Sequence, residues 1–135
     1  MTLQYEDLTG KILEACFEVS NELGAGFLES VYHKALIIAL RQKGLQLRSE
    51  VPISVMFRGQ NVGEFYADLV VEEKIIVELK AVSALAKEHI AQVLNYLYAG
   101  SIVVGLLVNF GTPKMEYRRL ERRERNIGRK EESEI

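Results

Sequence analysis

The sequence predicts a single α/β domain in which a mixed β-sheet is flanked by helices. Two observations support this prediction. Apolar residues recur at helical spacing in the first third of the chain, and after Gly44 they change to the alternation that is typical of β-strands. The chain has 135 residues, 48% of them hydrophobic, which suffices for one buried core and makes a second unlikely on grounds of size.

Two amphipathic helices are expected first. The apolar side of the first runs from Leu8 to about Gly24, where glycines at positions 24 and 26 permit the backbone angles that end a helix. The second is predicted over residues 29–43, with Gly44 as its cap. The single cysteine, Cys16, falls on the apolar side of the first helix, so we expect a buried, inert thiol and no disulfide or multi-cysteine metal centre within the chain.

Three or four strands should follow as an antiparallel meander. Residues 45–57 alternate between apolar and polar, residues 58–61 suit a turn, and strands are predicted at 62–71 and 75–79. A third helix is predicted from Ser83, as its N-cap, to about Ala99. The apolar run 102–108 is expected to be a strand covered on both faces, and residues 115–120 form the last predicted strand.

The predicted domain spans residues 1–120, and residues 121–135 form a charged tail that we expect to be a frayed helix or disordered. This tail carries five basic and five acidic residues and therefore no net charge. The whole chain has a net charge of −2, which disfavours a free-standing, tight DNA binder. Its polar, acidic start is not a secretory signal and the 102–108 run is too short to span a bilayer, so a cytoplasmic protein without a membrane partner is expected.

The chemistry is expected at Asp68, Glu78 and Lys80. Glu78 and Lys80 are two residues apart on a predicted strand, so their side chains leave the same face. If residues 72–74 form a three-residue loop, Val71 pairs with Ile75 and Asp68 lies opposite Glu78. Facing carboxylates destabilise a sheet by up to about 1 kcal/mol, so a positive group is expected between them, either Lys80 or a divalent cation.

Two interpretations of this constellation are open. Mg²⁺, with Mn²⁺ as a substitute, is bound by one or two carboxylates together with water and phosphate oxygens, and it would polarise a phosphodiester and lower the pKa of a bound water. Lys80 would then orient or activate that water, or stabilise charge in the transition state. Alternatively, the three side chains form a structural ion pair on a half-exposed sheet.

Three motifs in order give the sequence a resemblance to a known family. Residues 26–32 resemble the signature of the GxxExxY proteins, a branch of the PD-(D/E)XK nuclease superfamily. Asp68 and the segment 78–80 lie where the superfamily's own motif lies, with Ala67 in place of its proline, and residues 92–96 resemble the Q-x-x-x-Y element of RecB-like members. The resemblance covers residues 8–120 and implies a restriction-endonuclease-like core.

The resemblance also implies roles for residues outside the strands. Glu29 would be a third acidic group at the metal, next to Asp68 and Glu78, and Gln92 would complete the catalytic site. Supporting or substrate-binding roles fall to Tyr32, His89 and Tyr96. The two tyrosines could equally be core aromatics, and a histidine such as His89 is more often structural than functional. His33 is predicted to lie off the Glu29–Tyr32 face and has no expected role.

We therefore expect a metal-dependent, nuclease-like phosphodiesterase that acts on DNA, with RNA as an alternative substrate. A rival hypothesis is a catalytically inactive nucleic-acid-binding or regulatory module that keeps the nuclease fold. A third is an interaction protein in which the charged cluster is purely structural. A protein partner or a homodimer is compatible with each of them.

Overall fold

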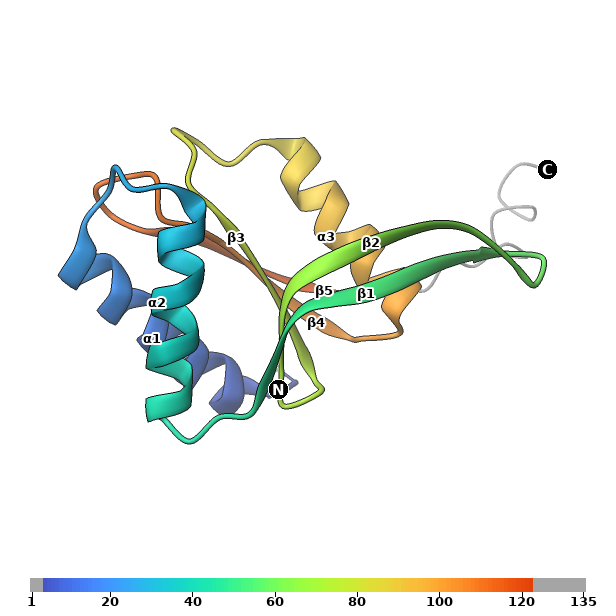
Figure 1. Cartoon of the computed structure of the whole chain (residues 1–135), viewed down its shortest axis with the longest axis horizontal. Coiled ribbons are helices and arrows are strands. Elements are labelled where there is room, and N and C mark those ends of the chain that lie inside the picture. The colour runs from blue at the N-terminus through green and yellow to red at the C-terminus, as the bar shows by residue number, and fades with distance from the viewer. Residues whose placement is uncertain (1–3, 123–135) are drawn as a thin grey trace.

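The computed structural model describes residues 4–122, which form a five-stranded mixed sheet with helices on both faces (Figure 1). The predicted α/β class and single domain are confirmed. Along the chain, the elements are α1 (Glu6–Leu23), α2 (Glu29–Gln42), β1 (Leu47–Phe57), β2 (Gln60–Val71), β3 (Ile75–Lys80), α3 (Lys87–Gly100), β4 (Val104–Asn109) and β5 (Glu116–Glu121).

The strands lie in sequence order, β1-β2-β3-β4-β5, and only the β3–β4 pair is parallel. A parallel pair needs a crossover connection, and α3 supplies it on one face of the sheet, while α1 and α2 cover the other. Each face has its own core. One core joins α1 and α2 to residues such as Leu69 and Val77, and the other joins α3 to residues such as Val70 and Ile76.

The central strands and the apolar side of the first helix are buried as predicted. Every residue of β4 is buried, which agrees with the expectation of a strand covered on both faces. Cys16 lies in the core beneath α1, and burial raises the pKa of its thiol to about 12. The expectation of a buried cysteine is therefore confirmed, and a raised thiol pKa disfavours the reactive thiolate.

The third helix starts later than predicted, and Ser83 as its N-cap is wrong. Asn109 holds the preceding loop, because its side-chain amide accepts a hydrogen bond from the N–H of Val82 and donates one to the carbonyl of Val82, both at 3.0 Å. This pair of bonds fixes the chain against the end of β4 and keeps it out of the helix. The helix begins at Lys87, where His89 Nδ1 accepts a hydrogen bond from the N–H of Ala86.

Strands β1 and β2 form a long hairpin that reaches beyond the rest of the described chain (Figure 1). Near its base, Glu50 has φ 52°, a left-handed conformation that is rare in a strand. The alternation of β1 breaks there. Leu47 packs in the core under α1 and α2, whereas Val51 and Ile53, also odd-numbered, pack in the core under α3.

The described chain ends just beyond the last strand. Glu121, which we expected to open the charged tail, is the last residue of β5, so that boundary is too early. The remainder of the expected tail, from residue 123, lies outside the described residues. None of the three helices in the described part of the chain is long and apolar enough to cross a membrane.

Candidate active site

Asp68 and Glu78 meet where strands β2 and β3 separate. The strands pair through Val71 with Ile75 and through Leu69 with Val77, and this register, as predicted, places Asp68 opposite Glu78. The two side chains then replace the strand ladder. Glu78 Oε2 accepts a hydrogen bond from the N–H of Asp68 at 2.5 Å, and Asp68 Oδ2 accepts one from the N–H of Leu79 at 2.8 Å.

Both carboxyl groups are held in a poorly solvated place. Glu78 is only 4% exposed, and burial, followed by the charge of Asp68, raises its pKa to about 8. Burial also raises the pKa of Asp68, although the hydrogen bond from Leu79 opposes that shift. Desolvation and like charge disfavour the ionised form of both carboxyl groups. A cation bound between them would therefore stabilise their ionised forms.

Lys80 lies beside the two acids, at the end of β3. Its positive charge acts to lower the pKa of Asp68, of Glu78 and of Glu29. No carboxylate among the described residues lies within ion-pair distance of its ammonium group. The ammonium group therefore acts electrostatically on Asp68, Glu78 and Glu29 but forms an ion pair with none of them.

Glu29 approaches from the first turn of α2. Partial burial and the charge of Asp68 raise the pKa of its carboxyl group, so the helix brings it into the same field. The loop before it is tied by Tyr32, whose hydroxyl donates a hydrogen bond to the carbonyl of Gly24 at 2.5 Å and accepts one from the N–H of Phe27 at 3.2 Å. Gly26, inside this loop, has φ 112°, which favours glycine.

The tyrosine of this motif does not reach toward the acids. Tyr32 is fully buried, and its ring stacks on Phe110 with 4.9 Å between ring centroids. The spacing of Gly26, Glu29 and Tyr32 therefore has a structural explanation. The Tyr32 hydroxyl binds the backbone of the loop that contains Gly26, and this loop leads into α2, which begins at Glu29.

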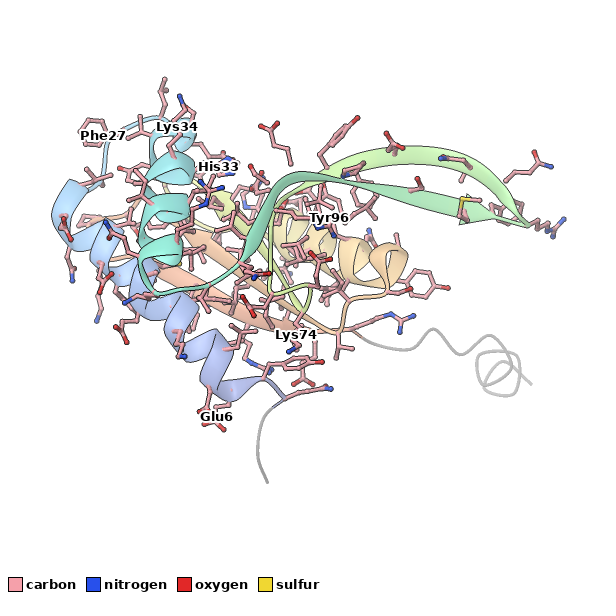
Figure 2. All side chains as sticks on the ribbon, turned by 60° about the horizontal axis from the view of Figure 1, so that its bottom comes forward. Glu6, Phe27, His33, Lys34, Lys74 and Tyr96 are labelled. Atoms are coloured by element: carbon pink, nitrogen blue, oxygen red, sulfur yellow. The ribbon has the colours of Figure 1, made fainter. Side chains whose placement is uncertain are left out.

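His33, for which we expected no role, lies beside the site, and its predicted place off the Glu29 face is wrong. It lies four residues after Glu29, on the same side of α2, and its charge acts on both Glu29 and Asp68. Its Nε2 lies 3.1 Å from Ser49 Oγ, so it spans from α2 to the base of the hairpin (Figure 2). The i, i+4 spacing was the signal that could have found it.

Helix α3 brings three more of the predicted residues to the opposite side. His89 uses Nδ1 to cap its own helix, and its charge also acts on Glu29. Burial and the charges of Glu78 and Asp68 raise the pKa of Tyr96, while a hydrogen bond with Gln92 acts in the other direction. The Tyr96 ring stacks on Phe65 of the hairpin at 3.9 Å, between α3 and that hairpin (Figure 2).

The acids fit one kind of metal site better than another. Among residues 4–122, no group of three or more His, Cys, Asp or Glu side chains is arranged to hold an ion. This disfavours a closed zinc-type centre, and it leaves Glu29 outside a common ligand set with Asp68 and Glu78, contrary to what the resemblance implies. Two adjacent carboxylates with raised pKa values suit Mg²⁺, which binds through one or two carboxylates and fills its remaining positions with water and phosphate oxygens. The donor set thus fits a hard divalent cation.

Comparisons with known proteins bear on the family and the fold of the chain. A family model described as the PD-(D/E)XK nuclease superfamily matches residues 6–120. The chain is also similar to the crystal structure of SSO0001, with a TM-score of 0.57 and 19% sequence identity, over 90% of this chain and 61% of that one. At this identity the likeness shows the fold alone. A search of curated proteins finds no significant match.

The chain belongs to the PD-(D/E)XK nuclease superfamily. Proteins of this superfamily are typically hydrolytic nucleases that use divalent metal ions. The chain spans about three fifths of the length of the similar solved chain (61%). The narrower GxxExxY and RecB-like assignments rest on the sequence motifs alone.

Proposed function

We propose that the protein is a metal-dependent phosphodiesterase that cleaves DNA. The observation that carries the proposal is the fork between β2 and β3, where Asp68 and Glu78 face one another with Lys80 beside them. Mg²⁺ is the proposed cofactor and Mn²⁺ its substitute, held by Asp68 and Glu78 with Glu29 approaching from α2. RNA remains an alternative substrate on the same chemistry.

The backbone fixes the two acids before any ligand arrives. Each carboxylate uses one oxygen to accept a backbone N–H group, which sets its orientation and leaves its other oxygen for a metal ion. A bound Mg²⁺ supplies Lewis acidity toward a phosphate oxygen and acidifies a coordinated water. Because the two carboxylates are desolvated and repel one another, a divalent cation relieves an existing electrostatic penalty.

Lys80 is proposed to act on the attacking water or on the charge that develops at phosphorus. Its ammonium group lies in the field of three acids and is bound to none of them by an ion pair among the described residues, so it is free to contact a phosphate. A cation placed where charge develops stabilises the transition state more than the ground state. Gln92 and Tyr96 are proposed to support the site from α3.

A cleavage assay with three proteins tests the proposal. Wild type should cut labelled DNA with Mn²⁺ or Mg²⁺ and not with EDTA, and Lys80→Ala should lose this activity. Lys11→Ala is the matched control, because Lys11 is exposed on α1 near the β2–β3 loop, at the other end of the sheet, and it should cut like wild type. Binding of metal and DNA without any cleavage would instead support the regulatory module.

A further inference from the structure

A groove of about 310 Å³ lies between α2 and the base of the hairpin. Its walls come from two elements. Helix α2 contributes Ser30, His33, Lys34 and Ile37, and β1 contributes Ser49 and Glu50. This volume lies at the lower end of the range of small-molecule sites, which suits a single nucleotide.

Two residues of the groove lie close to the proposed metal site. The charges of His33 and Glu50 act on the pKa of Asp68, and Glu50 lies between the β1 residues that pair with Leu69 and Ala67, across from Asp68. His33 forms the shared wall, held by its contact of 3.1 Å with Ser49 Oγ. Figure 2 shows His33 and the neighbouring Lys34 on α2, near the hairpin base.

The lining offers partners for both halves of a nucleotide. Lys34 is exposed and provides a cation for phosphate, and the hydroxyls of Ser30 and Ser49 provide hydrogen-bond donors. Glu50 provides an acceptor on the opposite wall. Among the described residues no ion pair joins Lys34 to Glu50. Lys34 and Glu50 therefore carry opposite charges on opposite walls of the groove and form no ion pair with one another.

The backbone at Glu50 is a second, independent observation. Its φ of 52° lies inside a strand, whereas the other non-glycine residues with positive φ among residues 4–122 lie in turns or at helix ends: Tyr5, Arg58, Glu72, Glu73 and Ser101. Glycine would adopt this conformation at about 1 kcal/mol less cost. Because Glu50 is exposed, its side chain does not stabilise the core, and a non-glycine residue in this backbone conformation points to a binding role for the side chain.

We propose that this groove is a subsite for one nucleotide next to the scissile phosphate. Lys34 binds the phosphate of that nucleotide, and Glu50 accepts a hydrogen bond from an amino group of its base. The proposal rests on the proposed function for the identity of the ligand, and it adds a preference: bases with an exocyclic amino group, such as cytosine, should be favoured over thymine.

Binding of fluorescent oligo-dC and oligo-dT, measured by anisotropy with Ca²⁺ in place of Mg²⁺, tests the subsite. Wild type should bind oligo-dC about fivefold or more tightly than oligo-dT. Glu50→Gly, which removes the carboxylate and suits the left-handed backbone, should abolish that preference. Lys34→Ala should weaken binding to both and reduce the slope of log K against log salt by about 0.7, the value for one phosphate contact on a single strand.

Lys11→Ala removes the same charge far from the groove and should leave the salt slope unchanged. The subsite is overturned if Lys34→Ala behaves like Lys11→Ala, if wild type shows no preference for oligo-dC, or if Glu50→Gly keeps it. Cleavage by wild type together with any of these results would leave the phosphodiesterase standing. Conversely, binding that depends on Lys34 and Glu50 without cleavage would support the subsite and reject hydrolysis, and no binding at all would reject the subsite.

Discussion

Asp68 and Glu78 are locked to one another through the backbone: the N–H of Asp68 is bound by the carboxylate of Glu78, and the carboxylate of Asp68 binds the N–H that follows Glu78. Two acids that repel each other are thus held together by the sheet that carries them. Burial raises the pKa of both groups, and the charge of Asp68 adds to the rise at Glu78. The account of function depends on this arrangement.

The first prediction concerns stability and pH without metal. The pKa of Glu78 is raised from 4.5 to about 8, so between these values the folded protein keeps a proton that the unfolded chain has lost. The stability contributed by this group is therefore fully present below pH 4.5 and is lost as the pH rises through about 8. In EDTA, the midpoint of thermal unfolding should fall over this range.

The variant Glu78→Gln cannot ionise, and its amide can still accept the N–H of Asp68. It should unfold at a higher temperature than wild type above pH 8, with a flatter pH profile. Glu22→Gln, on the exposed side of α1, is the control and should follow wild type. If the unfolding temperatures of wild type and Glu78→Gln change with pH in parallel, the pKa of Glu78 is not raised in the folded protein.

A second prediction follows for metal binding. Because protons and the cation compete for the same carboxylates, Mg²⁺ or Mn²⁺ should raise the unfolding temperature of wild type more above pH 8 than near pH 6. The variants Asp68→Asn and Glu78→Gln should lose most of this stabilisation. Equal stabilisation of the two variants and wild type would place the ion elsewhere.

The third prediction separates the amine from the acids. Lys80→Ala should keep the metal-induced rise in unfolding temperature but lower kcat for DNA cleavage by about 10²-fold or more, the usual range for a group acting on the reacting atoms. Lys80→Arg keeps the charge and should recover part of the rate if the role is electrostatic. A Lys80→Ala protein with wild-type kcat would exclude Lys80 from the chemistry.

The fourth prediction concerns the loop before α2. Tyr32→Phe removes the hydroxyl that binds Gly24 and Phe27 and keeps the ring stacked on Phe110. It should lower the free energy of unfolding by about 1–2 kcal/mol, as expected for lost hydrogen bonds, in a denaturant titration. If the loop positions Glu29, Tyr32→Phe should also lower kcat for DNA cleavage by a larger factor than it changes KM. An unaltered kcat would show that Tyr32 contributes to stability alone.

Much of the fold could be predicted because the determining signals are local. Helical spacing marked α1 and α2, the apolar run marked β4, and the three-residue loop set the register that brings Asp68 to Glu78. The start of α3 could not be read in this way. It depends on Asn109, which lies 27 residues from Val82 in the sequence and clamps the loop where Ser83 looked like a cap.

The candidate site shows the same division. Asp68, Glu78 and Lys80 follow from strand alternation within a short stretch, whereas the contribution of His33 depends on how α2 packs against the base of the hairpin. The left-handed conformation of Glu50 could not be predicted from the sequence either, since a glutamate within a strand does not indicate a positive φ. Long-range packing, not local propensity, decides these two residues.

The most direct measurement is a crystal of the protein soaked in Mn²⁺ near pH 8, with anomalous diffraction used to locate the ion. The account predicts one strong peak between the carboxylates of Asp68 and Glu78, about 2 Å from an oxygen of each, as is usual for small divalent cations. A crystal in which the Lys80 ammonium fills that space and no peak appears would contradict it.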